Sequence, residues 1–335
     1  MTFPLPEQCA TADGRTRRMG VELEFAGLEL DAISAHITAL YGGRVERGSR
    51  FAHRIRDTRW GTFTAEIDTA VLKDGDYLDW LDSVGIHVRD SASRGRVDDL
   101  LARLAGTVVP HEIVTPPIPF DELHALEDLR ARLQRDHAQG TRASVFYAFG
   151  MHFNPEAVAL DAEYLLAVLQ AFLLLEDWLQ VRGTVDWSRR MTPYIKEFPP
   201  AYRTLALAAD YRPDRAGLIA DYLEHNPTRN RPLDLLPIFR EINGDSVIRQ
   251  VPEAGLVGAR PAFHYRLPDC RIDEPDWTIA REWRGWIAVE WLAARPERRA
   301  AMAEAWREHG AAPRLGRVDR AWAQQSLDWL EPCAL

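Results

Sequence analysis

The sequence is almost without lysine. Of its 41 lysine and arginine residues only Lys73 and Lys196 are lysines, so nearly every cation is a guanidinium. The three cysteines, Cys9, Cys270 and Cys333, are too few and too widely spaced for a disulfide framework or a structural zinc site. The net charge of -9 argues against nucleic acid as the main partner, because phosphate binding needs a dominant basic surface.

Long apolar runs are also missing. The longest spans residues 164–175, contains Gln170 and ends in two acids, so it is too short to cross a bilayer. Residues 1–6 lack the basic start and apolar core of a signal peptide. We therefore expect a cytoplasmic protein without a membrane partner. Its 335 residues, 46% of them hydrophobic, are enough for a large core.

What the sequence does contain is segments that alternate between apolar and polar side chains. In residues 20–25, Glu22 and Glu24 alternate with Val21, Leu23 and Phe25, the pattern of a strand with one buried face. Two carboxylates about 4 Å apart repel by about 4 kcal/mol at an effective dielectric of about 20. A cation between them would remove this repulsion, and a divalent metal is the first candidate.

The same alternation recurs in four later segments. Their polar faces carry Glu66 and Asp68 (residues 62–68), Glu112 (108–117), His152 and Asn154 (145–154), and His264 and Arg266 (260–267). Helical patterns occupy residues 32–41, 97–104, 120–139, 161–181 and the tail from 275, and Asp31 is the expected N-cap of the first helix. Strands and helices without regular alternation predict an α+β fold with a largely antiparallel sheet. We expect helices on its outer face and an open, ligand-binding inner face.

The expected organisation is one catalytic unit with additions. Residues 1–18 are predicted to form a flexible N-terminal segment and residues 19–294 the catalytic domain. Helical insertions are expected at about 155–245, and residues 295–335 are expected to form a helical extension.

In chain order, the chemistry-bearing residues resemble those of the putative amidoligase family, whose members are carboxylate-amine ligases related to glutamine synthetase and glutamate-cysteine ligase. The residues that carry the resemblance are Glu22, Glu24, Asp68, Glu112 with Thr115-Pro116, His152 and Arg266, within residues 19–287. The resemblance implies a glutamine-synthetase-like sheet, two magnesium ions, ATP, and amide formation through an acyl phosphate.

The resemblance also implies roles for individual residues. Glu22, Glu24, Asp68 and Glu112 would hold the metals, with His152 near metal or ATP phosphate. Arg266 would contact phosphate and act with Glu112 in catalysis, and Arg231 lies in a stretch similar to the family's Arg-x-x-x-Asn-Leu region. The residues themselves suggest that Lys196 binds the nucleotide and that Arg54 and Arg56 bind a substrate carboxylate. Glu66 is expected to be structural.

The sequence departs from the family pattern at two positions. The late strand of these ligases reads Glu-x-Arg, whereas this chain has His264-Tyr265-Arg266, and Asp234 stands where the family has asparagine. Histidine can ligate a divalent ion, but exchanging a carboxylate for it removes one negative charge from the site. Weaker magnesium binding, a preference for manganese, or loss of activity would follow.

Three functions are compatible with these residues. The first is an ATP-dependent ligase that joins a small-molecule or peptide carboxylate to an amine, with Mg²⁺ or Mn²⁺. The second is a catalytically silent relative that binds nucleotide or peptide as a scaffold. The third is a metallohydrolase that uses the same acids around a metal-bound water. The substrates and the oligomeric state stay open: oligomerisation is possible, but the tryptophans of the C-terminal tail do not by themselves indicate an interface.

Overall fold

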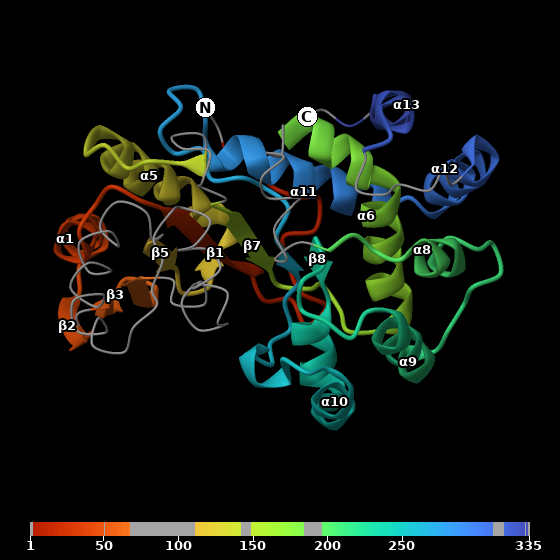
Figure 1. Ribbon diagram of the computed structural model, residues 1–335, viewed down its shortest axis with the longest axis horizontal. Helices are drawn as coiled ribbons and strands as arrows, with labels where there is room; N and C mark the ends of the chain where they lie inside the picture. Colours follow the sequence, from red (N-terminus) through yellow and green to blue (C-terminus); the bar gives the residue numbers. More distant parts are fainter. Residues whose placement is uncertain are drawn as a thin grey trace, which may run out of the picture.

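A computed structural model describes residues 3–49, 51–67, 111–141, 149–183, 196–310, 318–331 and 333. Asp68, Lys73 and the helix expected at residues 97–104 lie outside this part. Within it, nine strands form one antiparallel sheet that combines with helices distributed along the chain (Figure 1). The α+β class and the antiparallel sheet are therefore confirmed.

The sheet runs from the β2 edge to β8. Its order is β2 (Arg44–Ser49), β3 (Ala52–Thr58), β4 (Gly61–Ile67), β5 (His111–Val114), β1 (Arg18–Phe25), β7 (Met151–Pro155), β9 (His264–Tyr265) and β8 (Leu233–Asp234). The short strand β6 (Ile118–Pro119) pairs with the start of β1. β1 thus lies in the middle, between β5 and β7, which places its polar side chains at the centre of the open face.

Helices cover the apolar face of this sheet. Helix α1 (Leu30–Tyr41) packs on β3 and β4, where the Tyr41 ring stacks on Phe63 with centroids 5.4 Å apart. Helix α11 (Ile279–Ala293) covers β7, where Trp283 lies 5.3 Å from Phe153 between ring centroids. Val21, Leu23 and Phe25 of β1 are fully buried. The apolar side chains of the predicted alternation therefore face the core, and the polar ones face the candidate site.

The remaining helices surround this arrangement. They are η2 (Phe120–Ala125), α5 (Leu126–Arg135), α6 (Ala162–Gly183), α8 (Pro200–Ala206), α9 (Arg215–His225), α10 (Leu236–Gln250), η4 (Ala254–Leu256), α12 (Pro296–His309) and α13 (Arg320–Leu330). Among the described residues, only α6 is long and apolar enough to cross a membrane, yet 83% of its most apolar window is buried in the protein, as in a core helix. In Figure 1 it stands as the long helix that separates the sheet from α8 and α12.

Helix α1 begins earlier than expected. Glu29, not Asp31, is its N-cap residue, and no side chain caps the helix by a hydrogen bond. Asp31 lies in the first turn, and its carboxylate pairs instead with Arg47 at 2.7 Å. The helix ends at Gly42 (φ 75°), and a Cβ on Gly43 (φ 91°) would come within 2.4 Å of the Arg56 carbonyl oxygen, so this turn requires glycine.

The last predicted strand is much shorter than its alternating pattern. Only His264 and Tyr265 form β9, although residues 260–267 alternate throughout. Pro261 and Pro268 flank this strand and have no N–H to donate to a ladder, which limits the length of chain that can pair.

Both ends of the chain are held by buried polar contacts. Arg17, which has no exposed surface, makes a two-pronged ion pair with Glu290 of α11 at 2.6 and 2.8 Å. At the other end, the Trp322 indole of α13 donates to the Leu174 carbonyl of α6 at 2.8 Å. Residues 3–17 and the C-terminal helices therefore pack against the central unit.

Candidate functional site

Three carboxylates lie side by side across three neighbouring strands. Glu24 of β1 is directly opposite Glu112 of β5, which is directly opposite Glu66 of β4. The next residues in the same ladders, including Leu23 and Ile113, are fully buried, so the acids are on the opposite, open face. Like charges in directly opposed positions destabilise a sheet, and a bound cation would offset their repulsion. Glu66, expected to be structural, belongs to this row.

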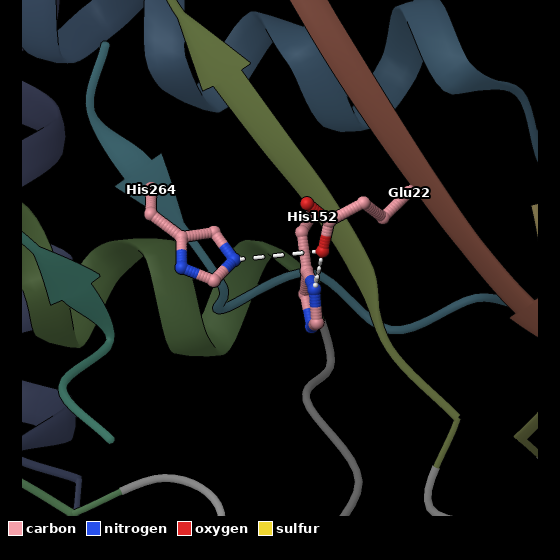
Figure 2. A group of neighbouring side chains, drawn as sticks. All are labelled: Glu22, His152 and His264. Carbon is pink, nitrogen blue, oxygen red and sulfur yellow. Dashed lines mark hydrogen bonds and ion pairs between the residues drawn. The ribbon is translucent and has the colours of Figure 1, made fainter. Parts of the chain in front are cut away.

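Glu22 is the centre of a second group on the same face. Its Oε2 lies 2.7 Å from Nδ1 of His152 and 3.6 Å from Nε2 of His264. Figure 2 shows the two rings, from β7 and β9, converging on the Glu22 carboxylate from β1. Burial alone would raise the pKa of Glu22, but His264 and His152 hold that pKa well below its usual range. Glu22 is therefore an anion in the folded protein.

His152 connects the two groups. Its Nδ1 contacts Glu22, while its Nε2 lies 3.6 Å from Oε1 of Glu24. The other Glu24 oxygen accepts a hydrogen bond from the Gly150 amide at 2.6 Å, which fixes the carboxylate. Burial lowers the pKa of His152, so the neutral ring, which can donate a lone pair to a metal, predominates at neutral pH.

These residues form two overlapping sets of possible metal ligands. Glu22, His152 and His264 form one, and Glu24, Glu112 and His152 form the other, each with ligand atoms within 4.8 Å of one another. The buried Nε2 of His264 makes no hydrogen bond to any described residue, as expected for an atom that faces a ligand. Mixed carboxylate and imidazole donors suit manganese and other transition ions better than magnesium, which prefers oxygen throughout.

The two departures from the family pattern are neighbours. Asp234 of β8 is directly opposite His264 of β9, and its Oδ2 lies 3.7 Å from His264 Nδ1. The other Asp234 oxygen accepts from the Leu236 amide at 2.8 Å, so the carboxylate is held in place. Asp234 therefore attracts one nitrogen of the ring while the other faces Glu22.

Arg266 belongs to the same neighbourhood. It is buried, and its Nη1 donates to the Arg229 carbonyl at 3.0 Å. Burial lowers its pKa, and Asp234, Glu24 and Glu22 act in the opposite direction. The guanidinium is thus a cation within the electrostatic reach of both acid groups.

The other predicted site residues lie elsewhere. The guanidinium of Arg231 donates to the carbonyls of Lys196 and His225 at 3.2 and 3.3 Å, which ties two segments together, and the Lys196 side chain is exposed. Arg54 and Arg56 are on the open face of β3, three strand spacings or roughly 14 Å from β1. Arg56 pairs there with Glu46 of β2.

Sequence reasoning assigned no role to Arg260. Its Nη2 donates to Oδ1 of Asn154 at 2.7 Å, and Asn154 Nδ2 donates to Oε1 of Glu22 at 2.9 Å. These bonds hold the Glu22 carboxylate through Oε1, whereas His152 contacts Oε2. The only sequence signal was that Asn154 shares a strand face with His152.

A cavity of about 880 Å³ opens beside Glu22 and Asn154. It is lined by the beginning of β1, the chain after β5 and the residues around Arg260, so the candidate metal ligands lie at one end of the site and the cavity occupies the rest. The arrangement can hold a cation against one wall of a space large enough for a substrate.

Comparison with known proteins identifies the family. No match to the chain was found among the curated proteins or the solved structures, so the glutamine-synthetase-like form of the sheet stays a prediction. A family model described as putative amidoligase enzyme matches residues 15–288. This range contains every strand of the sheet and both groups of candidate metal ligands. The chain belongs to the putative amidoligase enzyme family.

Proposed function

We propose that this protein is an ATP-dependent ligase that joins a carboxylate to an amine with the help of Mg²⁺ or Mn²⁺. The observation that carries the proposal is the convergence of Glu22, Glu24, Glu112 and two histidines on one sheet face. Membership in a family of amidoligases gives the reaction class, and the acid-rich face gives a place for metal-bound phosphate.

Each group of the site has a distinct task in this proposal. Glu22, Glu24 and Glu112 would hold the cation together with His152 and His264. A cation there would supply positive charge that neutralises phosphate oxygens. Arg266 stabilises the charge of the transferring phosphoryl group from the side of β9. Asp68 lies outside the described residues, and its role as a further ligand stays a prediction.

The proposed reaction has two balanced steps. An oxygen of the substrate carboxylate attacks the terminal phosphorus of ATP, the bond to ADP breaks, and an acyl phosphate forms. The amine nitrogen then attacks the acyl carbon, and phosphate leaves with the electron pair of its bond to that carbon. Glu112 has two oxygens, so one can hold the cation while the other accepts the proton that the amine releases.

The donor set leads us to expect that manganese supports the reaction better than magnesium. His264 offers an imidazole nitrogen where the family pattern has a carboxylate, and a hard cation such as magnesium prefers oxygen ligands. ATP hydrolysis should be measured with each metal across carboxylate, amino acid, peptide and polyamine substrates. Acceptor-stimulated ADP release, with a product mass equal to the two substrates minus water, is the expected result.

A matched pair of variants separates chemistry from folding. Glu24→Gln keeps an acceptor for the Gly150 amide but removes a charged ligand, so turnover and metal-induced stabilisation should both be lost. Glu304→Gln makes the same change at an exposed position on α12 and should behave as the wild type. If the wild type shows neither nucleotide binding nor acceptor-stimulated hydrolysis with either metal, the ligase proposal is wrong.

The second candidate is a relative that binds nucleotide without turnover. His264 favours this candidate, because its imidazole stands where the family pattern has a glutamate and lies 3.6 Å from Glu22. Tight ATP binding by the wild type without hydrolysis, and hydrolysis after His264→Glu, would identify this function.

A further inference from the structure

Strand β1 forms one side, here called the floor, of the cavity beside Glu22, and the strand geometry gives the length of this side. Arg18 and Glu22 are both on β1, both line the cavity, and they are four residues apart on the same strand face. Four residues of antiparallel strand extend about 14 Å. An extended peptide of about four residues has the same length, whereas a single amino acid is far shorter.

The walls of the cavity are apolar and rigid. Val114, Pro117 and Pro119 line one side, and Pro261 with Ala262 lines another. Proline has a fixed φ, so these walls change little in shape when a ligand enters. The cavity volume of about 880 Å³ also falls within the usual range for ligand sites.

Among the described residues that line the cavity, one cation is available to a ligand. The guanidinium of Arg15 is held by Asp13 at 2.8 Å and Glu156 at 3.3 Å, and that of Arg260 is bonded to Asn154. Arg18 is exposed, and its guanidinium makes no hydrogen bond or ion pair with any residue in the described ranges. Arg18 can therefore make a two-pronged contact with a carboxylate.

The acidic residues that line the cavity differ in whether their carboxylates already have partners. Glu122 accepts a hydrogen bond from the Trp60 indole at 3.0 Å, and Glu156 is engaged by Arg15. Asp121 is exposed, and in the described part of the chain no hydrogen bond or ion pair to its carboxylate is found. It can accept from backbone N–H groups of a ligand. Glu22, at the far end, can accept a hydrogen bond from a neutral amine, the form of an N-terminus that can attack an acyl carbon.

We propose that this cavity binds a short peptide of about four residues, with its C-terminal carboxylate on Arg18 and its N-terminal amine beside Glu22. The inference rests on the ligase function proposed above, because it makes this peptide the amine substrate. The peptide amine then lies next to the acid groups where the acyl phosphate would form, and the apolar walls bury the peptide side chains.

The test measures peptide binding by calorimetry without ATP. The probes are a pooled tetrapeptide library, its C-terminally amidated counterpart, and the alanine series from the free amino acid to pentaalanine. We expect the wild type to bind free carboxylates about tenfold more tightly than amides, because one charge-assisted contact is lost in the amides. Arg18→Gln should bind both forms equally, and Arg44→Gln, which changes an exposed arginine on β2, should keep the preference.

The length series and the capped peptides provide independent checks. Affinity should increase up to about four residues and then stop increasing, as the floor length requires. N-acetylated peptides should still bind but should not be joined to a carboxylate. The inference is overturned if no peptide binds, if single amino acids bind as tightly as tetrapeptides, or if Arg18→Gln keeps the preference for carboxylates.

The same measurements separate this inference from the ligase proposal. Nucleotide and manganese binding with no peptide binding would overturn the peptide site and leave the metal site in place. Peptide binding that depends on Arg18, in a protein that binds neither nucleotide nor metal, would support the peptide site and contradict the ligase.

Discussion

Asp234 and His264 are cross-strand partners, and they are also the two positions at which this chain departs from the pattern of its family. A histidine replaces the expected glutamate, and an aspartate replaces the expected asparagine on the neighbouring strand. One carboxylate is lost at β9 and one is gained at β8. The number of negative charges in this corner of the site is therefore conserved.

The first prediction is that these two positions are energetically coupled. His264→Glu alone places a new carboxylate against Asp234 and Glu22 and should lower the free energy of unfolding. Adding Asp234→Asn should recover stability, with a coupling energy of about 0.5–3 kcal/mol. Urea unfolding of the wild type, the two single variants and the double variant, in the presence of a chelator, measures this energy.

The double variant should also change metal preference. It provides an oxygen donor where the wild type provides nitrogen, so magnesium should compete better with manganese. Additive stability effects together with an unchanged metal preference would show that the two positions act independently.

The second prediction concerns the contact between Asn154 and Glu22. Asn154 links Glu22 to Arg260, so Asn154→Ala leaves the Glu22 carboxylate less firmly held. Affinity for Mn²⁺ should fall about 10–100-fold, as is usual when a residue that orients a metal ligand is removed. Gln324→Ala on the exposed side of α13 is the control, and an equal loss there would mean that the effect is not local.

The third prediction compares a buried ion pair with an exposed one. Arg17→Met leaves the Glu290 carboxylate, whose side chain is only 9% exposed, without its cation, which should lower the free energy of unfolding by about 3–5 kcal/mol. Arg44→Met breaks the exposed ion pair with Asp57 and should change the free energy of unfolding by less than about 1 kcal/mol. Combining Arg17→Met with Glu290→Met should recover part of the loss, and equal effects of the two single variants would contradict the structure.

The fourth prediction is a pH dependence from Glu282. Burial raises the pKa of this carboxyl above its unfolded value, so the folded state binds the proton more tightly. Glu282 therefore contributes stability that is fully present below the unfolded pKa and is lost as the pH rises through the folded pKa. Glu282→Gln should reduce this loss. Unfolding free energies from weakly acidic to neutral pH check the sign, and an unchanged slope would contradict it.

Local patterns predicted a large part of this architecture. The alternation around Glu22 and Glu24 identified a strand and both of its faces, because a side-chain period of two is a property of any strand. It could not give the strand order. Glu66 was therefore left out, although the order β4-β5-β1 brings it opposite Glu112.

Contacts between distant segments explain the remaining differences. Asp31 has a good capping side chain, but Arg47 on β2 binds it instead. Arg231 matched a family motif, but its donors contact backbone carbonyls, which no sequence pattern records. Arg260 reaches a side chain 106 positions away, and only the folded chain shows that pairing.

Because core and open-face side chains alternate along β1, the open face can be changed without disturbing the core, which makes a substrate-trapping variant possible. Its odd-numbered side chains are buried in the core while its even-numbered ones lie on the open face, so Glu24→Gln should leave a well-folded protein that cannot complete a reaction cycle. Immobilised on a resin, such a variant would retain whatever occupies the cavity beside Glu22. Mass spectrometry of the eluate would then identify the natural substrate directly.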